Sequence, residues 1–447
     1  MHDLIRWSDA HPSRAPRERA PLVWIGDAVR VSGARLAPDA QSFAACGRSH
    51  PLRLAGRLAS NRSWFDARSA AFYAAHDALL RGRWDGGTFV ARSLWPQPWR
   101  LGPGPPPLSS ARAAAPAGVR EMMRSGGDGF AAATLWQREP ATAWTGKAVL
   151  AFVVNGAQGD DDEAHAGHFS IATGRIAGDG AIADWLVNSF YALDVVSEKG
   201  ILAAPVPLER YQADVNSGQS WYRPTWALVA VLDDERAAVR VQSALNRTFR
   251  QFWRGQLPYY HPTDNCTSIA VDALRAIGLG VPLRGPTARL GAWLALPWLV
   301  LRERSLANAK LAYDYLVTER TRLLPAVALD AVLEALATLA DGRRPPHGAL
   351  DRELAADLAA LAWLAIPQLP SSRAPGREPA FSLAEYRARV PSDPAQRQII
   401  PLPPRVLPDA LRDDDLPPPL PHPSDAAVRW WLVAPLALAA LALAFGG

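Results

Sequence analysis

Residues 257–278 read LPYYHPTDNCTSIAVDALRAIG, a stretch that changes from a loop into a helix. Its two prolines exclude regular backbone hydrogen bonding in the first part, because proline lacks an N–H group. Asp264 and Asn265 are residue types that cap helix N-termini, and apolar side chains then recur at helical spacing up to a terminal glycine. The stretch therefore predicts a helix whose first turn contains Cys266.

A cysteine in the first turn of a helix is a candidate nucleophile. Unpaired backbone N–H groups and the helix dipole favour the thiolate there, so this position is expected to lower the pKa of the Cys266 thiol. The thiolate is the reactive form in cysteine catalysis. The alternative is a buried structural thiol, a common role for a single cysteine. We treat Cys46, which has no convincing partner pattern, as structural.

Two earlier segments supply candidate partners for the thiol. His168 follows Gly167 at the head of an apolar stretch and is a candidate general base. Asn188 lies within the apolar segment LVNSF, where a buried amide needs a hydrogen-bond partner and could orient an imidazole ring. Asp184 is a weaker candidate for the orienting role, and His261 is a competing base.

These motifs, taken together, resemble a known family. Gly167–His168 at the head of a strand, Asn188 in an Asn-Ser-Phe strand and the segment YYHPTDNCTS at 259–268 are similar to the Lnb N-terminal periplasmic domain family, a domain of largely unknown function. That family belongs with the permuted NlpC-type papain-like proteins, in which the histidine strand precedes the cysteine helix. The resemblance covers residues from about 118 to 285.

The resemblance implies a fold and a set of roles. It implies an α+β, papain-like (permuted NlpC-type) domain with an antiparallel sheet and helices. It also implies Cys266 as the nucleophile, His168 as the base and Asn188 as the orienting residue. Family members usually enter the periplasm, whereas the sequence as given has no secretory signal at its N-terminus.

The pattern of apolar residues predicts a strand meander followed by helices, which is an α+β order. Unbroken or alternating apolar runs predict strands at 148–154, 168–174, 183–193 and 225–232. A long amphipathic helix is then expected up to Trp253, before the helix that contains Cys266. Nearer the N-terminus, a helical segment within 61–83 and a short strand at 88–94 are expected.

Composition divides the chain into five regions. The boundaries are 1–117 for an N-terminal mixed α/β region of unknown role, 118–285 for the papain-like domain, 286–366 for an apolar helical region, 367–427 for a proline-rich linker and 428–447 for a transmembrane helix. Within the helical region, residues 351–366 are expected to be helical to their end. The proline-rich linker is expected to have no fold of its own.

Two apolar segments bear on membrane association. Residues 430–447 carry no charge and would span about 27 Å as a helix at 1.5 Å per residue, just enough for a bilayer core. Arg429 and two tryptophans precede or begin this segment, as interfacial anchors do. We expect a membrane anchor there rather than a buried core helix. Residues 290–301 are too short to span, and are either core or in contact with the membrane surface.

Composition argues against several functional classes. The net charge is +5, only three of 48 basic residues are lysines, and no basic stripe with interleaved aromatics appears, so nucleic-acid binding is not expected. Two cysteines exclude a disulfide scaffold and a four-cysteine zinc site. The acidic loop 160–163, with His165 and His168, lacks the alternate spacing of a calcium loop and is interpreted as solvated rather than metal-binding. No cofactor or metal is expected.

The sequence thus predicts a membrane-anchored thiol enzyme that hydrolyses or transfers an acyl group at an amide or ester. The apolar helices and the anchor favour a lipid, lipoprotein or envelope substrate. The alternative is a catalytically inactive papain-like module that binds or assembles at the membrane. The absence of a signal and the arginines before the apolar tail favour a cytoplasmic domain on a single-pass C-terminal anchor, whereas the resemblance implies the periplasm.

Overall fold

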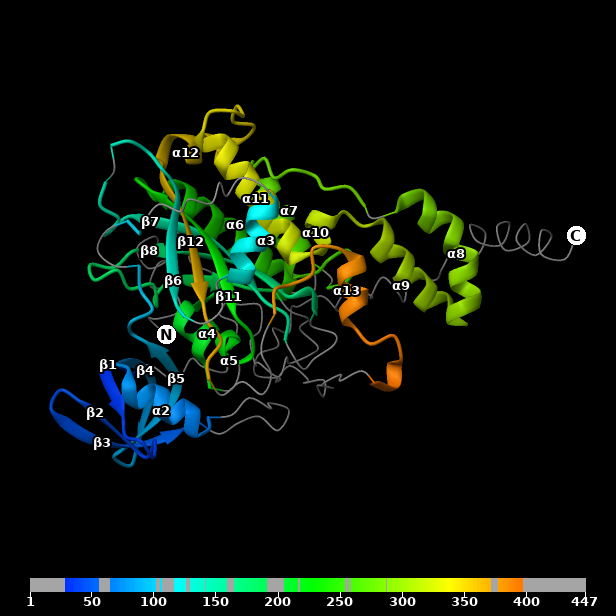
Figure 1. Cartoon of the computed structure of the whole chain (residues 1–447). Helices are drawn as coiled ribbons and strands as arrows, with labels where there is room; N and C mark the ends of the chain where they lie inside the picture. The colour runs from blue at the N-terminus through cyan, green and yellow to red at the C-terminus, as the bar shows by residue number, and fades with distance from the viewer. Residues whose placement is uncertain are drawn as a thin grey trace, which may run out of the picture.

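The computed structural model describes residues 29–55, 65–101, 105–106, 116–125, 129–140, 142–158, 165–190, 205–215, 218–253, 257, 259–286, 288–370 and 377–396. Two β structures organise them: a closed five-stranded barrel and a seven-stranded sheet with helices packed on it (Figure 1). The chain is therefore an α+β protein, as the sequence predicts. In Figure 1 the barrel lies at the lower left and a helical hairpin projects to the right.

The barrel forms from the N-terminal region. Its elements are β1 (Val29–Leu36), β2 (Ser42–Ala45), β3 (Arg48–Leu54), α2 (Ala67–Ala75), β4 (Ala78–Asp85) and β5 (Thr88–Pro96). The strand order is β1-β2-β3-β5-β4, and β1 pairs with β4 to close the barrel. Phe43, Leu80 and Phe89 fill its interior. The strand expected at 88–94 is confirmed, but the helix expected within 61–83 ends at Ala75 and a strand follows.

The larger sheet has the order β10-β9-β8-β7-β11-β12-β6, and every neighbouring pair is antiparallel. Its strands are β6 (Ala131–Gln137), β7 (Ala148–Asn155), β8 (His168–Arg175), β9 (Leu186–Asn188), β10 (Val206–Pro207), β11 (Thr225–Leu232) and β12 (Leu358–Ile366). Central strands β7 and β11 are buried along their whole length. Helices pack on one face of the sheet, and residues of the barrel region pack on the other. Their unbroken apolar runs therefore predicted them correctly. Of the strand expected at 183–193, the described residues 183–190 form a strand only at β9, and residues 191–193 lie outside the described residues.

Helices cover one face of this sheet. They are α3 (Pro116–Ser125), α6 (Arg236–Trp253), α7 (Cys266–Ala276) and α11 (Pro325–Ala340), which pack with Phe152 and Leu228 of the sheet in one apolar core. Two short helices, α4 (Leu208–Ala213) and α5 (Gln219–Tyr222), pack with the barrel on the other face, around Val153 and Val229. We call these two faces the helix face and the barrel face.

The helical interpretation of residues 358–366 is wrong. These residues, LAALAWLAI, form β12, which pairs with β11 on one side and β6 on the other. Leucine and alanine favour helices locally, but all nine side chains are buried between the two faces, so tertiary pairing overrides propensity. The sheet thus takes a central strand from beyond residue 285.

The rest of residues 288–357 is mostly helical, as predicted. It contains α8 (Arg289–Glu303), α9 (Leu306–Val317), α10 (Arg320–Leu323), α11 and α12 (Ala349–Asp357). Helices α8 and α9 form a hairpin that stands away from the sheet (Figure 1). Ala292 of α8 and Ala309 of α9 are fully buried, and small side chains of this kind let two helices approach closely.

Part of the proline-rich region is also folded. Arg377 forms a β-bridge with Ala157, and α13 (Leu383–Arg389) follows. Phe381 and Leu383 are buried in the helix-face core, and the Arg120 guanidinium lies 4.3 Å from the centre of the Phe381 ring. The interpretation of this region as a linker without a fold is therefore wrong for residues 377–396.

Buried ion pairs join the barrel to α4. Glu209 is fully buried and forms an ion pair with Arg81 of β4, and Arg30 of β1 lies 3.7 Å away. Asp214, which follows α4, bonds to Arg92 of β5 at 2.9 Å. Removing one member of such a pair would leave an uncompensated buried charge, so these contacts fix how the barrel sits on the sheet.

The described residues include no helix long and apolar enough to cross a membrane. The transmembrane helix expected at 428–447 lies outside the described residues, as do residues 397–427.

Candidate functional site

A capped N-terminus defines the start of α7. The Asn265 side chain accepts hydrogen bonds from the backbone N–H groups of Thr267 at 2.8 Å and Ser268 at 3.0 Å. The Ser268 hydroxyl in turn accepts from the Asn265 N–H at 2.7 Å, which completes a capping box. The predicted helix start is thus confirmed, and Cys266 is its first residue.

Protein atoms enclose the Cys266 thiol, which is only 7% exposed. This burial raises the pKa of the Cys266 thiol, despite opposing contributions from the Phe169 backbone amide, the Thr267 hydroxyl and the charge of Arg223. The Thr267 oxygen lies 3.8 Å from the sulfur. The expectation that the helix start lowers this pKa is therefore wrong for the structure described, because loss of hydration outweighs the nearby donors.

Arg223 places a buried positive charge near the thiol. Its Nε donates to the side chain of Gln219 at 3.0 Å, and one terminal nitrogen donates to the carbonyl oxygen of Gly156 at 3.3 Å. The guanidinium is 4% exposed, so these two contacts hold it at the end of the sheet where β7 ends and β11 begins. It favours the ionised form of the neighbouring sulfur by Coulomb attraction.

His168 is the first residue of β8, opposite Asn155 of β7. Its Nε2 lies 2.6 Å from the Ser189 hydroxyl. Gly167 precedes it with a φ of +81°, and a Cβ there would come within 2.6 Å of both the Asn155 carbonyl oxygen and Pro379. The glycine is thus required both by its backbone conformation and by close approach, and it fixes how the strand carrying the histidine begins.

Side chains alternate along β8, so consecutive residues point to opposite faces. Phe169 and Ile171 pack in the helix-face core, whereas Ala172 packs on the barrel face. By this alternation His168 and Ser170 belong to the barrel face. Ser170 bonds to Tyr211 of α4 on that face at 3.2 Å.

Asn188 does not orient the imidazole as expected. It pairs with Ile171, so its side chain lies on the helix face, where its amide nitrogen is 3.5 Å from the Asn246 side-chain oxygen. The next residue, Ser189, points to the other face and takes the contact with His168. The weaker candidate, Asp184, forms an ion pair with Arg30 of the barrel at 2.6 Å.

A buried polar network surrounds the head of β8 on the barrel face. The Tyr211 hydroxyl donates to the Asn155 side-chain oxygen at 2.5 Å, and the Asn155 amide nitrogen donates to Thr225 at 2.8 Å. Thr225 continues the chain to Gln212 at 3.1 Å. Such connected buried groups hold one arrangement, because leaving any of them unpaired is costly.

The thiol and the imidazole therefore meet the head of β8 differently. The Phe169 amide, one residue from His168, faces the Cys266 sulfur. The ring of His168 bonds instead to Ser189. Cys266 of α7 contacts Phe169, and His168 is the residue before Phe169 on β8. The thiol and the Nε2 atom of the ring nevertheless have different partners, because Nε2 bonds to Ser189.

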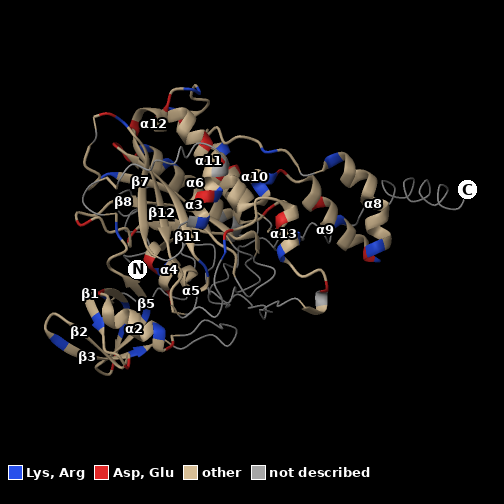
Figure 2. Cartoon of the chain, in the orientation of Figure 1, with Lys and Arg blue, Asp and Glu red and all other residues tan. Residues whose placement is uncertain are grey.

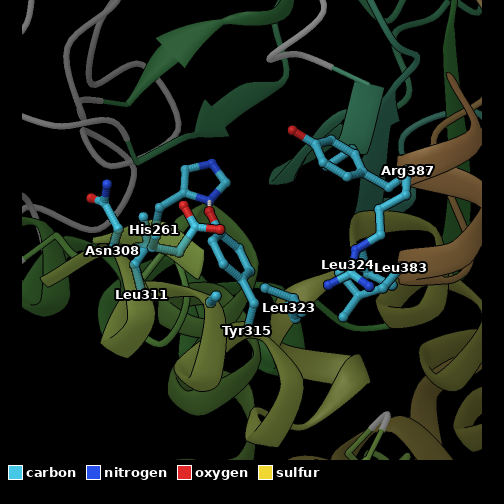
Figure 3. Close-up of a pocket in the computed structure, with 12 residues that line it drawn as sticks. His261, Asn308, Leu311, Tyr315, Leu323, Leu324, Leu383 and Arg387 are labelled. Carbon is cyan, nitrogen blue, oxygen red and sulfur yellow. Dashed lines mark hydrogen bonds between the residues drawn. The ribbon is translucent and has the colours of Figure 1, made fainter. Parts of the chain in front are cut away.

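A cavity of about 300 Å³ is lined by residues near the candidate site in sequence, but by neither Cys266 nor His168 (Figure 3). Two of the lining residues are close in sequence to the candidate site residues. Ala166 lies two residues before His168, and His261 lies five residues before Cys266. The full lining is Ala166, His261, Glu303, Asn308, Leu311, Ala312, Tyr315, Leu323, Leu324, Leu383, Tyr386 and Arg387. The volume is at the lower end of the range for small-molecule pockets, about 300–1,000 Å³. Most of the lining is apolar, with a few polar groups.

His261, the competing base, faces this cavity. Its Nδ1 lies 2.7 Å from the Tyr315 hydroxyl of α9, and the two rings point toward one another in Figure 3. His261 is an exposed residue on the cavity wall, and desolvation by the protein atoms near its ring lowers the pKa of His261. Its carbonyl oxygen accepts from the Asn265 side chain at 2.8 Å, which connects the cavity wall to the cap of α7.

Within the described ranges, no group of three or more His, Cys, Asp or Glu side chains is placed to hold a metal ion. His165 and His168 are both described and both buried. The acidic loop at 160–163 lies outside the described residues.

Comparison of the chain with protein-family models, with curated proteins and with solved structures found no match. The function of this site must therefore be argued from its own geometry.

Four features of the site were not predicted from the sequence. They are the Ser189 contact with His168, the Phe169 amide, the charge of Arg223 and the cavity. Ser189 follows Asn188 in the segment LVNSF. The sequence therefore indicated the right segment, but it gave the contact with His168 to the residue on the opposite face of the strand. Arg223 gave no signal, because a single arginine before a strand is common in an arginine-rich chain.

Proposed function

We propose that the chain is a papain-like thiol enzyme in which Cys266 attacks an acyl carbonyl. The observation that carries this proposal is the position of Cys266: the first residue of a capped helix, with its sulfur against the strand that His168 begins. A histidine strand before a cysteine helix, on an antiparallel sheet, is the order that the resemblance to permuted NlpC-type proteins implies.

The arrangement suits formation of a thioester. The Asn265 side chain accepts from the N–H groups of Thr267 and Ser268, and in this proposal the N–H of Cys266, the first residue of the helix, donates to the substrate oxygen. Backbone donors of this kind stabilise the negative charge that develops on the carbonyl oxygen. Arg223 favours the thiolate during the attack.

His168 is the proposed base, and its ring, which lies on the barrel face in the structure, reaches around the head of β8 to the thiol in the proposed reaction. A hydrogen bond from its Nε2–H to Ser189 would make Nδ1 the basic nitrogen. In the proposed reaction His168 takes the thiol proton, the sulfur bonds to the acyl carbon, and the leaving alcohol or amine departs with that proton. Water or a second acceptor then releases the acyl group from the sulfur. The burial that raises the thiol pKa means that proton transfer accompanies attack rather than preceding it.

The cavity supports an apolar acyl substrate. Leu311, Leu323, Leu324 and Leu383 line it, whereas Arg387 offers a charge for a polar end group. We propose that an acyl chain of a lipid or lipoprotein occupies this space. The predicted anchor at 428–447 would hold the enzyme at a membrane, where such substrates occur.

A second candidate is a catalytically inactive binding module at the membrane. It is favoured by the raised pKa of Cys266 and by the His168 contact with Ser189 in place of the thiol. In this account the cavity binds an acyl chain without turnover.

The test is hydrolysis of p-nitrophenyl esters by the purified full chain. We expect octanoate to be cleaved faster than acetate, and Cys266→Ala to abolish cleavage while Cys46→Ala does not. Leu311→Asn should lower kcat/KM for octanoate but not for acetate, with Leu283→Asn, an exposed position outside the cavity, as the matched control. Equal cleavage by Cys266→Ala would exclude the thiol mechanism, and lipid binding without cleavage would favour the binding module.

A further inference from the structure

Helix α8 exposes a continuous apolar stripe. At about 100° per residue its five large exposed side chains fall within an arc of roughly 140°. They are Leu290 (73% exposed), Trp293 (47%), Leu294 (63%), Trp298 (55%) and Leu301 (75%). Clustered exposure of this kind, unlike single exposed apolar residues, is typical of an interaction surface.

The opposite side of α8 is also apolar. Ala292 and Leu299 are buried there, and the helix packs against α9 through this side. A helix that is apolar all round is normally enclosed. Here one side of α8 packs against α9, and no described residue covers the other side.

Charges border the stripe but do not interrupt it. Residues 290–301 carry none, and the flanking positions hold Arg289, Arg302 and Arg304, with Glu303 the single acid, 3.8 Å from Arg302. Figure 2 shows α8 uncharged between basic ends. The Arg302 guanidinium lies 5.0 Å from the centre of the Trp298 ring. Tryptophan with arginine at the edge of an apolar surface is typical of the interface between lipid tails and headgroups.

We propose that the α8 stripe docks on the surface of a lipid bilayer with anionic headgroups. Three observations select this occupant: the basic flanks complement anionic lipid, the tryptophans suit the interface, and the chain beyond residue 396 ends in the uncharged run 430–445. That run would hold the folded part near a membrane. The docking does not depend on the thiol chemistry.

Docking of α8 would also fix the position of the cavity relative to the bilayer. Glu303 at the end of α8 and Leu311 on α9 both line the cavity, so the hairpin joins the proposed membrane contact to the acyl-sized space.

Photocrosslinking tests this proposal on the unmodified full chain. The chain is placed in vesicles of phosphatidylcholine and phosphatidylglycerol that contain a diazirine-labelled phospholipid, and adducts are mapped by mass spectrometry after illumination. We expect adducts within 289–303 but not within the barrel peptide 78–96, which carries the exposed Trp84 and serves as an internal control. The double variant Leu294→Glu/Leu301→Glu should reduce the α8 adducts several-fold, and Trp84→Glu should not.

Two results would overturn the proposal. An unlabelled α8, whether or not 430–445 is labelled, would mean that the stripe does not contact lipid. Disulfide dimers of a Leu301→Cys variant in these vesicles, together with an absence of α8 adducts, would show that a second copy of the chain covers the stripe instead.

Discussion

The backbone amide of Phe169 faces the sulfur of Cys266, so the nucleophile candidate sits one residue along β8 from the base candidate His168. Helix α7 brings the thiol there because Asn265 caps its first turn and its apolar side packs on the sheet. The imidazole is held separately by Ser189. This geometry yields predictions for the thiol, for the ring and for the fold that positions them.

Alkylation of Cys266 should be slow near neutral pH. Because burial raises the pKa of its thiol above the ordinary value of about 8.5, the folded protein holds less thiolate than the unfolded chain. We expect iodoacetamide to label Cys266 more slowly in buffer than in urea, because a raised pKa leaves less thiolate in the folded protein. The exposed Cys46 controls for the reagent.

The same shift fixes the direction of a stability effect. Because the thiol pKa is higher in the folded protein than in the unfolded chain, its contribution to stability is fully present below the pKa of the unfolded chain. That contribution is lost as the pH rises through the pKa of the folded protein. Wild-type protein should therefore lose stability above about pH 8.5 more steeply than Cys266→Ser. Labelling of folded Cys266 at neutral pH as fast as in urea would contradict both expectations and indicate a preformed thiolate.

Ser189, rather than Asn188, should position the imidazole. Ser189→Ala removes the 2.6 Å contact to Nε2 and should lower kcat for ester cleavage by about fivefold with KM little changed, the effect of losing roughly 1 kcal/mol. Steady-state kinetics of the ester cleavage measures both constants. Asn188→Ala, whose amide contacts Asn246, should affect stability more than kcat. The reverse result would restore the role that the family resemblance implies.

Gly278 should be irreplaceable at the end of α7. Its φ is +94°, and a Cβ there would lie 2.6 Å from the Ala349 nitrogen and 2.7 Å from the Gly348 Cα. Gly278→Ala should therefore cost about 2–5 kcal/mol, from about 1–2 for the backbone and about 1–3 for the clash. Gly342→Ala, with φ +66° and open space around it, should cost only the backbone part. Urea unfolding measures both, and equal losses would mean that α7 and α12 do not approach so closely.

Glu209 should secure the barrel against the sheet. Glu209→Ala leaves Arg81 buried without its partner and should cost about 3–5 kcal/mol in the free energy of unfolding. The matched control is Asp85→Ala, which breaks the exposed Arg53–Asp85 pair of the same barrel and should cost less than about 1 kcal/mol. Similar losses in urea unfolding would show that the buried pair does not hold the interface.

Local patterns predicted the central strands and the cysteine helix because their signals are strong. β7 and β11 are uninterrupted apolar runs buried on both faces, and α7 begins with a capping pair. β12 was missed for an equally physical reason. Its leucines and alanines favour a helix, and only its partners β11 and β6, far away in sequence, make it a strand.

Cys266 and His168 lie where the sequence places them, at the start of α7 and at the start of β8, but their contacts differ from those expected. A one-residue step along a strand reverses the face, which is why Asn188 was chosen where Ser189 makes the contact. The raised pKa of Cys266 comes from burial by residues distant in the chain, which a local pattern does not contain. The helix-start position, taken alone, predicted a lowered pKa. The cavity combines segments from 166 to 387, and no local pattern contains it.

The most direct test of the account asks whether Cys266 forms an acyl thioester. The full chain is mixed with p-nitrophenyl octanoate, quenched in acid within the first turnovers and digested, and the cysteine peptides are weighed by mass spectrometry. The account predicts an octanoyl group on Cys266 that hydroxylamine removes, none on Cys46, and strongly reduced labelling in His168→Gln. Absence of the acyl group from Cys266, or equal labelling of Cys46, would contradict it.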